Sequence, residues 1–340
     1  MNDLKKMITD LSLANGTSGA EDEIREKIKS FIPENMTVES DRLGNITAVL
    51  KGTGKTYLLD AHMDRIGLVV TGIEDGGFLR VAKVGGMDAR VLAAQDVTVW
   101  GKEPIYGVIT STPPHLSTGD DAKKAVDFDK ILVDTGLTKE KAEEIISLGD
   151  RITVRCPVTE LFNDRIAGAA LDDRAGCAAI IRAAELVAEA ENHPTVILLF
   201  ASQEETGGDG AHTGSFNITA DECIAVDVSF ADAPDMPSKK CGKLGKGPMI
   251  GIAPALNYRM SQKLIETAKK KEIPFQYETM GDSTGTDADD IAISKGGNLT
   301  ALVSIPQRNM HTGVEIVDIK DVENVAKLIA EYITGGGLDA

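Results

Sequence analysis

Thr195-Val-Ile-Leu-Leu-Phe-Ala201 is a strand-length apolar run that ends directly before Ser202-Gln-Glu204-Glu205. A short apolar run rich in branched side chains is typical of a strand buried on both faces of a sheet. A helical pattern over 172–191 precedes this strand, and strands and helices continue to alternate toward the end of the chain. This alternation predicts an α/β layer with a largely parallel sheet.

The first part of the chain supplies further elements of the same layer. Leu4, Met7 and Leu11 recur at helical spacing, and Ser18-x-x-Glu21 matches the capping box that begins a second helix. The early strands need partners, so we place them in the sheet formed by the later ones. The other predicted elements are strands 45–50, 55–61, 223–228, 248–253, 275–279 and 299–304, and helices 259–271, 287–295 and 319–333.

Residues 72–164 have a different pattern, in which short β-like runs are separated by glycine. Such spacing is typical of a small antiparallel barrel or sandwich. We therefore expect an α/β fold with a mixed, largely parallel sheet flanked by helices, formed by residues 1–71 and 165–340. Residues 72–164 would form a small β-barrel-like domain inserted into it. The short runs lie at 78–84, 97–100, 105–111 and 151–158.

Length and composition exclude several classes of protein. Single cores stop growing at roughly 250 to 300 residues, so a chain of 340 residues is expected to have more than one core. The 36 Lys and Arg against 53 Asp and Glu give a formal net charge of −17, which argues against nucleic acid or an anionic membrane as the partner. Aromatic residues make up only 4%, so Ile, Leu, Val and Ala should form most of the core.

The expected location is the cytoplasm. The N-terminal residues 1–7 lack the apolar segment of a secretory signal, and no apolar run approaches the ~20 residues of a membrane helix. The four cysteines form no C-x-x-C pair, which indicates reduced structural thiols rather than a zinc knuckle or a disulfide framework.

Histidine and carboxylate side chains follow the predicted strands. Ligands of open α/β sheets bind beyond the carboxyl ends of the strands, so the residues at these positions indicate function. Two of the five histidines in the chain occupy them. The candidate residues are His62 and Asp64 after strand 55–61, Glu204 and Glu205 after strand 195–201, Asp227 at the end of strand 223–228, His311 after strand 299–304, and Asp172 and Asp173 at the start of helix 172–191.

Each candidate residue has a simpler interpretation when it is taken alone. Asp172 would suit a helix N-cap, and His62 would suit a buried, hydrogen-bonded histidine. Independent surface residues, however, have no reason to follow four buried strands together. Imidazole and carboxylate ligands suit zinc, cobalt or manganese, and two histidines with several carboxylates support a two-metal site. The Glu204-Glu205 pair can also supply a carboxylate that accepts a proton from a water molecule between the metals.

The same segments resemble the M42 metallo-aminopeptidases, also called tetrahedral aminopeptidases, which include glutamyl aminopeptidase-like enzymes. The resemblance covers essentially the whole chain, including Gly85-Gly86 and Leu148-Gly-Asp150 in the inserted region. The segments that carry it are Asp60-Ala-His62-Met-Asp64-x-x-Gly67, Ala170-Leu-Asp172-Asp173-Arg174-x-Gly176, Gln203-Glu204-Glu205-x-Gly207, Asp227-Val228, Gly285-Thr-Asp287-Ala288 and Met310-His311-Thr312.

The resemblance implies two divalent metal ions per subunit, with Zn²⁺ or Co²⁺ favoured, and a division of roles among the candidate residues. Glu204 is the implied general base, and Asp64 is the carboxylate that orients or tunes the first histidine. The implied ligand sets share one bridging carboxylate: His62, Asp172 and Asp227 hold one ion, and Asp172, Glu205 and His311 hold the other.

The implied activity is the removal of N-terminal residues from peptides. Two cations would lower the pKa of a bridging water and polarise the scissile carbonyl, and Glu204 would pass the water's proton to the leaving amine. The family typically forms a hollow homo-dodecamer, built from dimers, through the inserted domain. This chain departs from the family pattern at Gly313, where proline is common, and over Thr206-Gly-Gly-Asp209. Both departures leave the implied ligands intact and bear on side-chain preference.

Other classes of function are weaker alternatives. A related metal-dependent carboxypeptidase or deacylase is the nearest. Gly281-Asp-Ser283-Thr-Gly285 matches the nucleophile elbow of serine hydrolases, but a Ser283 mechanism leaves His62 and the Glu pair unused. Gly52-Thr-Gly-Lys-Thr56 resembles a P-loop only superficially, because a strand and not a helix follows it. A non-enzymatic binding module would have no reason to keep the full ligand set.

Overall fold

The computed structural model describes residues 3–116, 126–234, 236–237 and 240–339, and within them a mixed sheet of eleven strands is the largest feature. The order along the sheet is β1-β2-β12-β3-β13-β16-β17-β11-β10, and β14 and β15 branch from β16. The strands are β1 (Thr37–Ser40), β2 (Ile46–Leu50), β3 (Thr56–His62), β10 (Thr159–Leu161), β11 (Arg165–Gly168), β12 (Thr195–Ala201), β13 (Glu222–Phe230), β14 (Met249–Ile252), β15 (Gln276–Thr279), β16 (Thr300–Arg308) and β17 (Glu315–Asp318).

The four central strands β12, β3, β13 and β16 run parallel, so their carboxyl ends lie at one edge of the sheet. Their register aligns the candidate residues. Ala201 lies beside His62, and Asp227 lies beside Ser304. Side chains that leave the strands at this edge therefore come close together.

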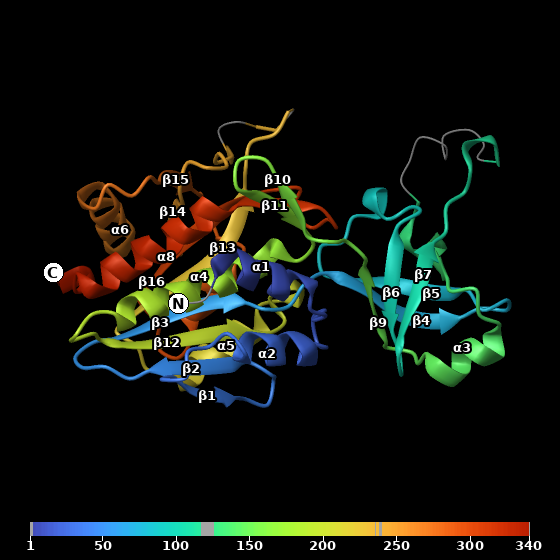
Figure 1. Ribbon diagram of the computed structural model, residues 1–340, viewed down its shortest axis with the longest axis horizontal. Helices are drawn as coiled ribbons and strands as arrows, with labels where there is room; N and C mark the ends of the chain where they lie inside the picture. The colour runs from blue at the N-terminus through green and yellow to red at the C-terminus, as the bar shows by residue number, and fades with distance from the viewer. Residues whose placement is uncertain (1–2, 117–125, 235, 238–239, 340) are drawn as a thin grey trace.

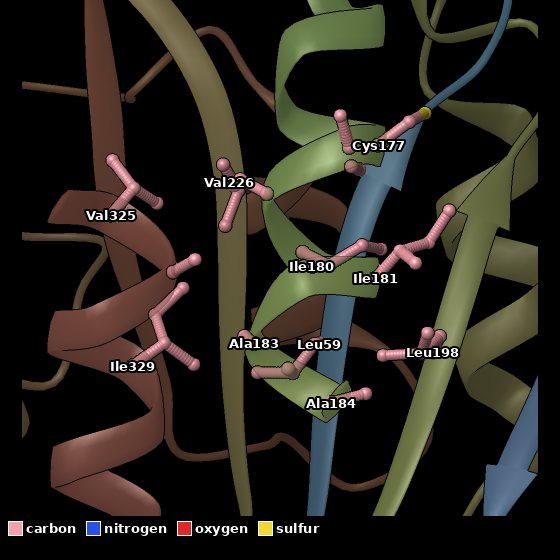
Figure 2. Close-up of a cluster of buried hydrophobic side chains, with 14 of the residues drawn as sticks. Leu59, Cys177, Ile180, Ile181, Ala183, Ala184, Leu198, Val226, Val325 and Ile329 are labelled. Carbon is pink, nitrogen blue, oxygen red and sulfur yellow. The ribbon is translucent and has the colours of Figure 1, made fainter. Parts of the chain in front are cut away.

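Helices cover both faces of this sheet, as predicted. Figure 2 shows α4 against the sheet, with Ile180 and Ile181 among Leu59, Leu198 and Val226. This core consists mainly of Ile, Leu, Val and Ala, which confirms the expectation from composition. One face carries α1 (Leu4–Leu13), α2 (Asp22–Lys29), α4 (Leu171–Ala188), α6 (Tyr258–Lys270) and α8 (Ile319–Thr334), and the other carries α5 (Asp209–Asn217) and α7 (Asp287–Ile293).

Six further strands form a closed barrel beside the main sheet (Figure 1). The barrel has its own apolar core, which includes Leu68, Val97, Val133 and Ile152. The predicted fold class, a largely parallel α/β sheet with an inserted β-barrel-like unit, is confirmed. The barrel elements are β4 (Gly67–Ile73), β5 (Leu79–Val84), β6 (Asp96–Trp100), β7 (Pro104–Ile109), β8 (Leu132–Asp134), α3 (Lys139–Ile145) and β9 (Arg151–Val154).

Strand pairing divides the chain close to the expected domain boundaries, with two differences. β4 begins at Gly67, before the expected boundary at residue 72, and it pairs with β5 and β9 inside the barrel. β10 lies before the expected boundary at 164, yet it pairs with β11 of the main sheet. The organisation into two domains stays a prediction.

Several elements were not predicted from the sequence, namely β1, β4, β8, β10, β11, β17 and α3. Two further local features also differ from the sequence predictions. The proposed capping box is wrong, because the Ser18 hydroxyl donates to Asp64 and Glu21 accepts from the Gly19 N–H. Helix α5 was not predicted, because its two glycines have low helix propensity. The close packing of α5 against the end of β12 explains the glycine at position 210. A Cβ at Gly210 would lie 2.0 Å from the carbonyl oxygen of Ser202, so only glycine lets α5 approach β12.

Among the residues described, no helix is both long enough and apolar enough to cross a membrane.

We expect Ile180→Ala to lower the free energy of unfolding of the main sheet by about 3 kcal/mol, because a fully buried side chain is replaced by a cavity. Circular dichroism during denaturation by urea measures this change. Trp100, the only tryptophan, lies in β6, so its fluorescence follows the barrel separately. Leu13→Ala, at an exposed position on α1, is the matched control. Equal stability of the two variants would contradict the role assigned to the α4 core.

Candidate metal centre

The structure brings the sequence-predicted residues together at the carboxyl edge of the central strands. His62 ends β3, Asp227 lies within β13, and Glu204 and Glu205 form a short 3-10 helix directly after β12. His311 lies in the connection between β16 and β17. Residues that are up to 249 positions apart, from 62 to 311, thus surround one cavity.

Asp172 lies between the two histidines, and this contact organises the site. Its Oδ1 is 3.1 Å from His62 Nε2, and its Oδ2 is 3.3 Å from His311 Nε2. His62 Nε2 also lies 3.8 Å from an Asp227 oxygen, and His311 Nε2 lies 3.4 Å from a Glu205 oxygen. One carboxylate therefore belongs to two adjacent groups of potential ligands.

The carboxylates in this cluster are too crowded to be ionised together without cations. Burial raises the pKa of Asp227 and of Glu205 well above the usual range, and the nearby Asp172 adds to both shifts. Burial also acts on Asp172, but hydrogen bonds with His311 and His62 lower its pKa. Burial would lower the pKa of His62, yet its contacts with Asp172 and Asp64 raise it. The repulsion among these acids must therefore be compensated by protons or by cations.

Asp64 contacts both His62 and the turn that carries Glu204 and Glu205. It is fully buried, and its Oδ1 lies 3.4 Å from His62 Nδ1. The same carboxylate accepts the backbone N–H of Glu204 at 3.0 Å and that of Glu205 at 3.3 Å, and it accepts the Ser18 hydroxyl. Asp64 therefore fixes the Glu pair relative to the histidine, a wider positioning role than the sequence suggested.

Arg174 anchors the segment that carries Asp172. Its guanidinium is fully buried and donates to the carbonyl oxygens of Leu11 at 2.7 Å, of Met63 at 3.3 Å and of Ala14. Burial lowers the pKa of Arg174 to about 9. The start of α4 is thus tied to the end of α1 and to the residue after His62.

Three connections that carry site residues contain a non-glycine residue in the left-handed region. Their φ angles are 56° at Ala170, 59° at Gln203 and 61° at His311. Each costs of order 1 kcal/mol, so the surrounding contacts must impose these conformations.

Two site residues were missed by sequence reasoning. Asp173 was noted without a role, yet it lies with His62 and Asp227 in a group whose ligand atoms are all within 4.8 Å of one another. Its Oδ2 finds no hydrogen-bond partner among the described residues. Glu315 begins β17 and accepts the backbone N–H of His311 at 3.1 Å and of Asp172 at 3.2 Å. The only signal for Glu315 was its position four residues after His311.

The inserted region contributes to the wall of the site through Gly85 and Gly86, which follow β5. A Cβ at Gly86 would lie 2.3 Å from His311 Nδ1, so a larger residue would displace the imidazole. Gly85 has a φ of +73°, and a Cβ there would lie 3.2 Å from a Glu205 oxygen. The backbone of the barrel thus approaches both residues closely.

The donor set fits divalent metal ions. Two groups of three ligands are present in the described chain, namely His62, Asp173 and Asp227, and Asp172, Glu205 and His311. Imidazole nitrogen and carboxylate oxygen are the donors of zinc and related sites. A buried oxygen of Asp173 has no hydrogen-bond partner among the described residues, so it is available as a donor to a cation.

The alternative nucleophile Ser283 is placed differently. It lies on an exposed loop between β15 and α7, at the mouth of the cavity. The Nε2 atom of His311 faces Asp172 and Glu205, so this imidazole is not oriented as a base for Ser283. The geometry favours the metal interpretation over the serine hydrolase.

A largely parallel α/β sheet whose strand ends carry a buried histidine and carboxylate cluster is the arrangement expected of a metal-dependent hydrolase. Comparison with known proteins agrees with this class. The model of the M42 glutamyl aminopeptidase family matches residues 44–328. The chain belongs to the M42 family and is a peptide-bond hydrolase.

Individual relatives match over most of their length. The lysyl aminopeptidase of Pyrococcus furiosus is 40% identical over 296 residues, which are 86% of this chain and 85% of that protein. An aminopeptidase structure from the archaeon Desulfurococcus kamchatkensis has a TM-score of 0.92 and 32% identity, with 99% and 96% of the two chains covered. The TET1 peptidase of Pyrococcus horikoshii, which can assemble into a tetrahedron or a large octahedral shell, has a TM-score of 0.86 and 32% identity over 97% of this chain and 99% of that chain.

We expect metal affinity to fall as the pH is lowered from 8 to 6. The pKa values of Glu205, Asp227 and His311 are raised, so more of these groups carry a proton at low pH and a cation must displace those protons to bind. Titration calorimetry with Zn²⁺ in two buffers of different ionisation heat measures both affinity and proton release. The control variant Glu39→Gln, at an exposed position on β1, should behave like the unmodified chain. Affinity independent of pH, without proton release, would contradict this electrostatic account.

Proposed function

We propose that the chain is a two-metal aminopeptidase that hydrolyses the first residue from peptides. The observation that carries the proposal is the position of Asp172, whose two oxygens face His62 and His311 separately. A carboxylate shared in this way is what a pair of adjacent cations requires of its bridging ligand.

The proposed ligands divide as the family resemblance implied. His62, Asp172 and Asp227 would hold one ion, and Asp172, Glu205 and His311 would hold the other, while Asp173 is close enough to serve the first group. When bound, the two ions, for which we favour Zn²⁺ or Co²⁺, supply Lewis acidity toward a carbonyl oxygen and lower the pKa of water.

Glu204 is the proposed general base. Its side chain is 17% exposed, against 4% for Glu205, 6% for Asp172 and 9% for Asp227, so it faces the cavity more than the other acids do. Burial raises the pKa of Glu204, and the nearby Asp172 and Asp64 add to the shift. A carboxylate of raised pKa can accept a proton from water and donate it to the leaving amine.

The free amine of the substrate would be held by a metal or by one of the adjacent carboxylates, which restricts cleavage to the N-terminus. This contact separates the proposal from the nearest alternative. A related carboxypeptidase or deacylase would accept a peptide whose amine is acetylated, whereas an aminopeptidase would not. Side-chain preference is not fixed by the family, since its description is glutamyl and the Pyrococcus furiosus relative is named lysyl.

The proposed assembly is a homo-dodecamer built from dimers through the inserted barrel. The TET1 relative supports large assemblies in the family, because it forms a tetrahedron or an octahedral shell. The net charge of −17 would help to keep such a particle dispersed. Peptides, and neither nucleic acid nor membrane, are the proposed partners, and the cytoplasm remains the predicted location.

We expect Glu204→Gln to lower kcat on aminoacyl anilides by about 100- to 10,000-fold, because the amide cannot accept the proton. Metal content measured by mass spectrometry should stay the same. Glu205→Gln is the matched variant from the same turn, and it should lose metal as well as activity. Full activity in Glu204→Gln would show that another group is the base.

A further inference from the structure

The cavity at the candidate metal centre continues beyond the ligands along one face of the main sheet. Its volume is about 800 Å³, and its wall extends from His62 and Asp227 to Ser229, Ser304 and Glu278. A cavity of this size has room for the side chain of a substrate residue in addition to the peptide bond.

Strand register places this part of the wall next to the metal ligands. Ser304 lies directly beside Asp227 in the parallel pair of β13 and β16, and Ser229 lies two residues beyond Asp227 on the same face of β13. Two residues of a strand span about 7 Å. A lysine side chain has a four-carbon stem of comparable length, so it could extend from the metal ligands to Ser229.

Glu278, on β15, turns its carboxylate toward these two serines. The carboxylate accepts hydrogen bonds from the Ser304 hydroxyl at 2.6 Å and from the Ser229 hydroxyl. Burial raises the pKa of Glu278 and the two serines lower it, and no Lys or Arg of the described chain contributes to the shift. The carboxylate is thus held by neutral donors and has no cationic partner within the described chain.

Apolar side chains line the cavity near this carboxylate. Met249, Met280 and Leu302 belong to the same wall. They can contact the methylene groups of a long side chain while its charged end reaches the acid. An apolar channel with a carboxylate at one end is complementary to Lys and Arg, and it leaves a neutral or acidic side chain without a partner for Glu278.

We infer that this wall binds the side chain of the first substrate residue and that Glu278 selects peptides beginning with Lys or Arg. The inference rests on the proposed aminopeptidase function, and it adds the substrate class and the residue that sets it. Lys240 also lines the cavity, but it is exposed, where water and salt weaken its interactions. A dominant Lys240 would instead favour acidic first residues.

The test compares lysyl, arginyl, norleucyl and glutamyl p-nitroanilides with the metal-loaded chain. Norleucine has the stem of lysine without its ammonium group. We expect kcat/KM for the lysyl substrate to exceed that for the norleucyl substrate by about 10- to 100-fold, which corresponds to one hydrogen-bonded charge pair. Glu278→Gln should remove this advantage, because it should lower kcat/KM for the lysyl substrate much more than for the norleucyl substrate. Lys240→Gln, the matched control, should keep the advantage.

Binding provides a readout that is independent of hydrolysis. Calorimetry with L-lysine and L-norleucine should show tighter binding of lysine, lost in Glu278→Gln. Equal loss of lysyl and norleucyl hydrolysis in that variant, or a preference of the unmodified chain for the glutamyl substrate, would overturn the inference. If no anilide were cleaved, the proposed aminopeptidase function would fail. In that case selective binding of lysine would still support the role of Glu278. Equal binding of lysine and norleucine would overturn that role.

Discussion

Carboxylates buried side by side repel one another unless positive charge lies between them, and the carboxyl edge of the central sheet is built under this constraint. Asp172, Glu205 and Asp227 converge on two imidazoles within 4 Å. Burial raises the pKa of Glu205 and of Asp227, whereas hydrogen bonds with the two imidazoles lower the pKa of Asp172. Asp64 and Glu315 keep the geometry by accepting backbone N–H groups from the same turns. Two divalent ions would relieve the repulsion without moving these elements.

The rest of the fold supplies the rigidity that such crowding requires. On the face opposite α5 and α7, α4 and α8 bury an aliphatic core against β3, β12 and β13 (Figure 2). Arg174 then ties the first turn of α4 to the end of α1. The barrel lies beside the strand ends (Figure 1), and its Gly85-Gly86 segment closes over His311 and Glu205. The geometry of the candidate site thus depends on both the main sheet and the barrel.

The sequence predicted the central strands and the strand-end acids because apolar runs and the residues that follow them are local signals. It could not predict Glu315, whose role comes from two backbone contacts, one of them to a residue 143 positions away. Ser18 matched a local capping pattern, but a distant carboxylate, Asp64, takes its hydroxyl. Helix α5 was missed because its glycines are explained only by contact with β12. Glu278 likewise gains meaning only from the register that sets it near Ser229 and Ser304.

The most direct test of the central claim is the number of metal ions bound per chain, measured by mass spectrometry after dialysis against Zn²⁺ or Co²⁺. The account predicts two ions in the unmodified chain and in the exposed control Glu39→Gln. Asp172→Asn, folded as judged by circular dichroism, should bind at most one, because the shared carboxylate would be lost. Two ions retained by Asp172→Asn, or a single ion in the unmodified chain, would contradict a site organised around Asp172.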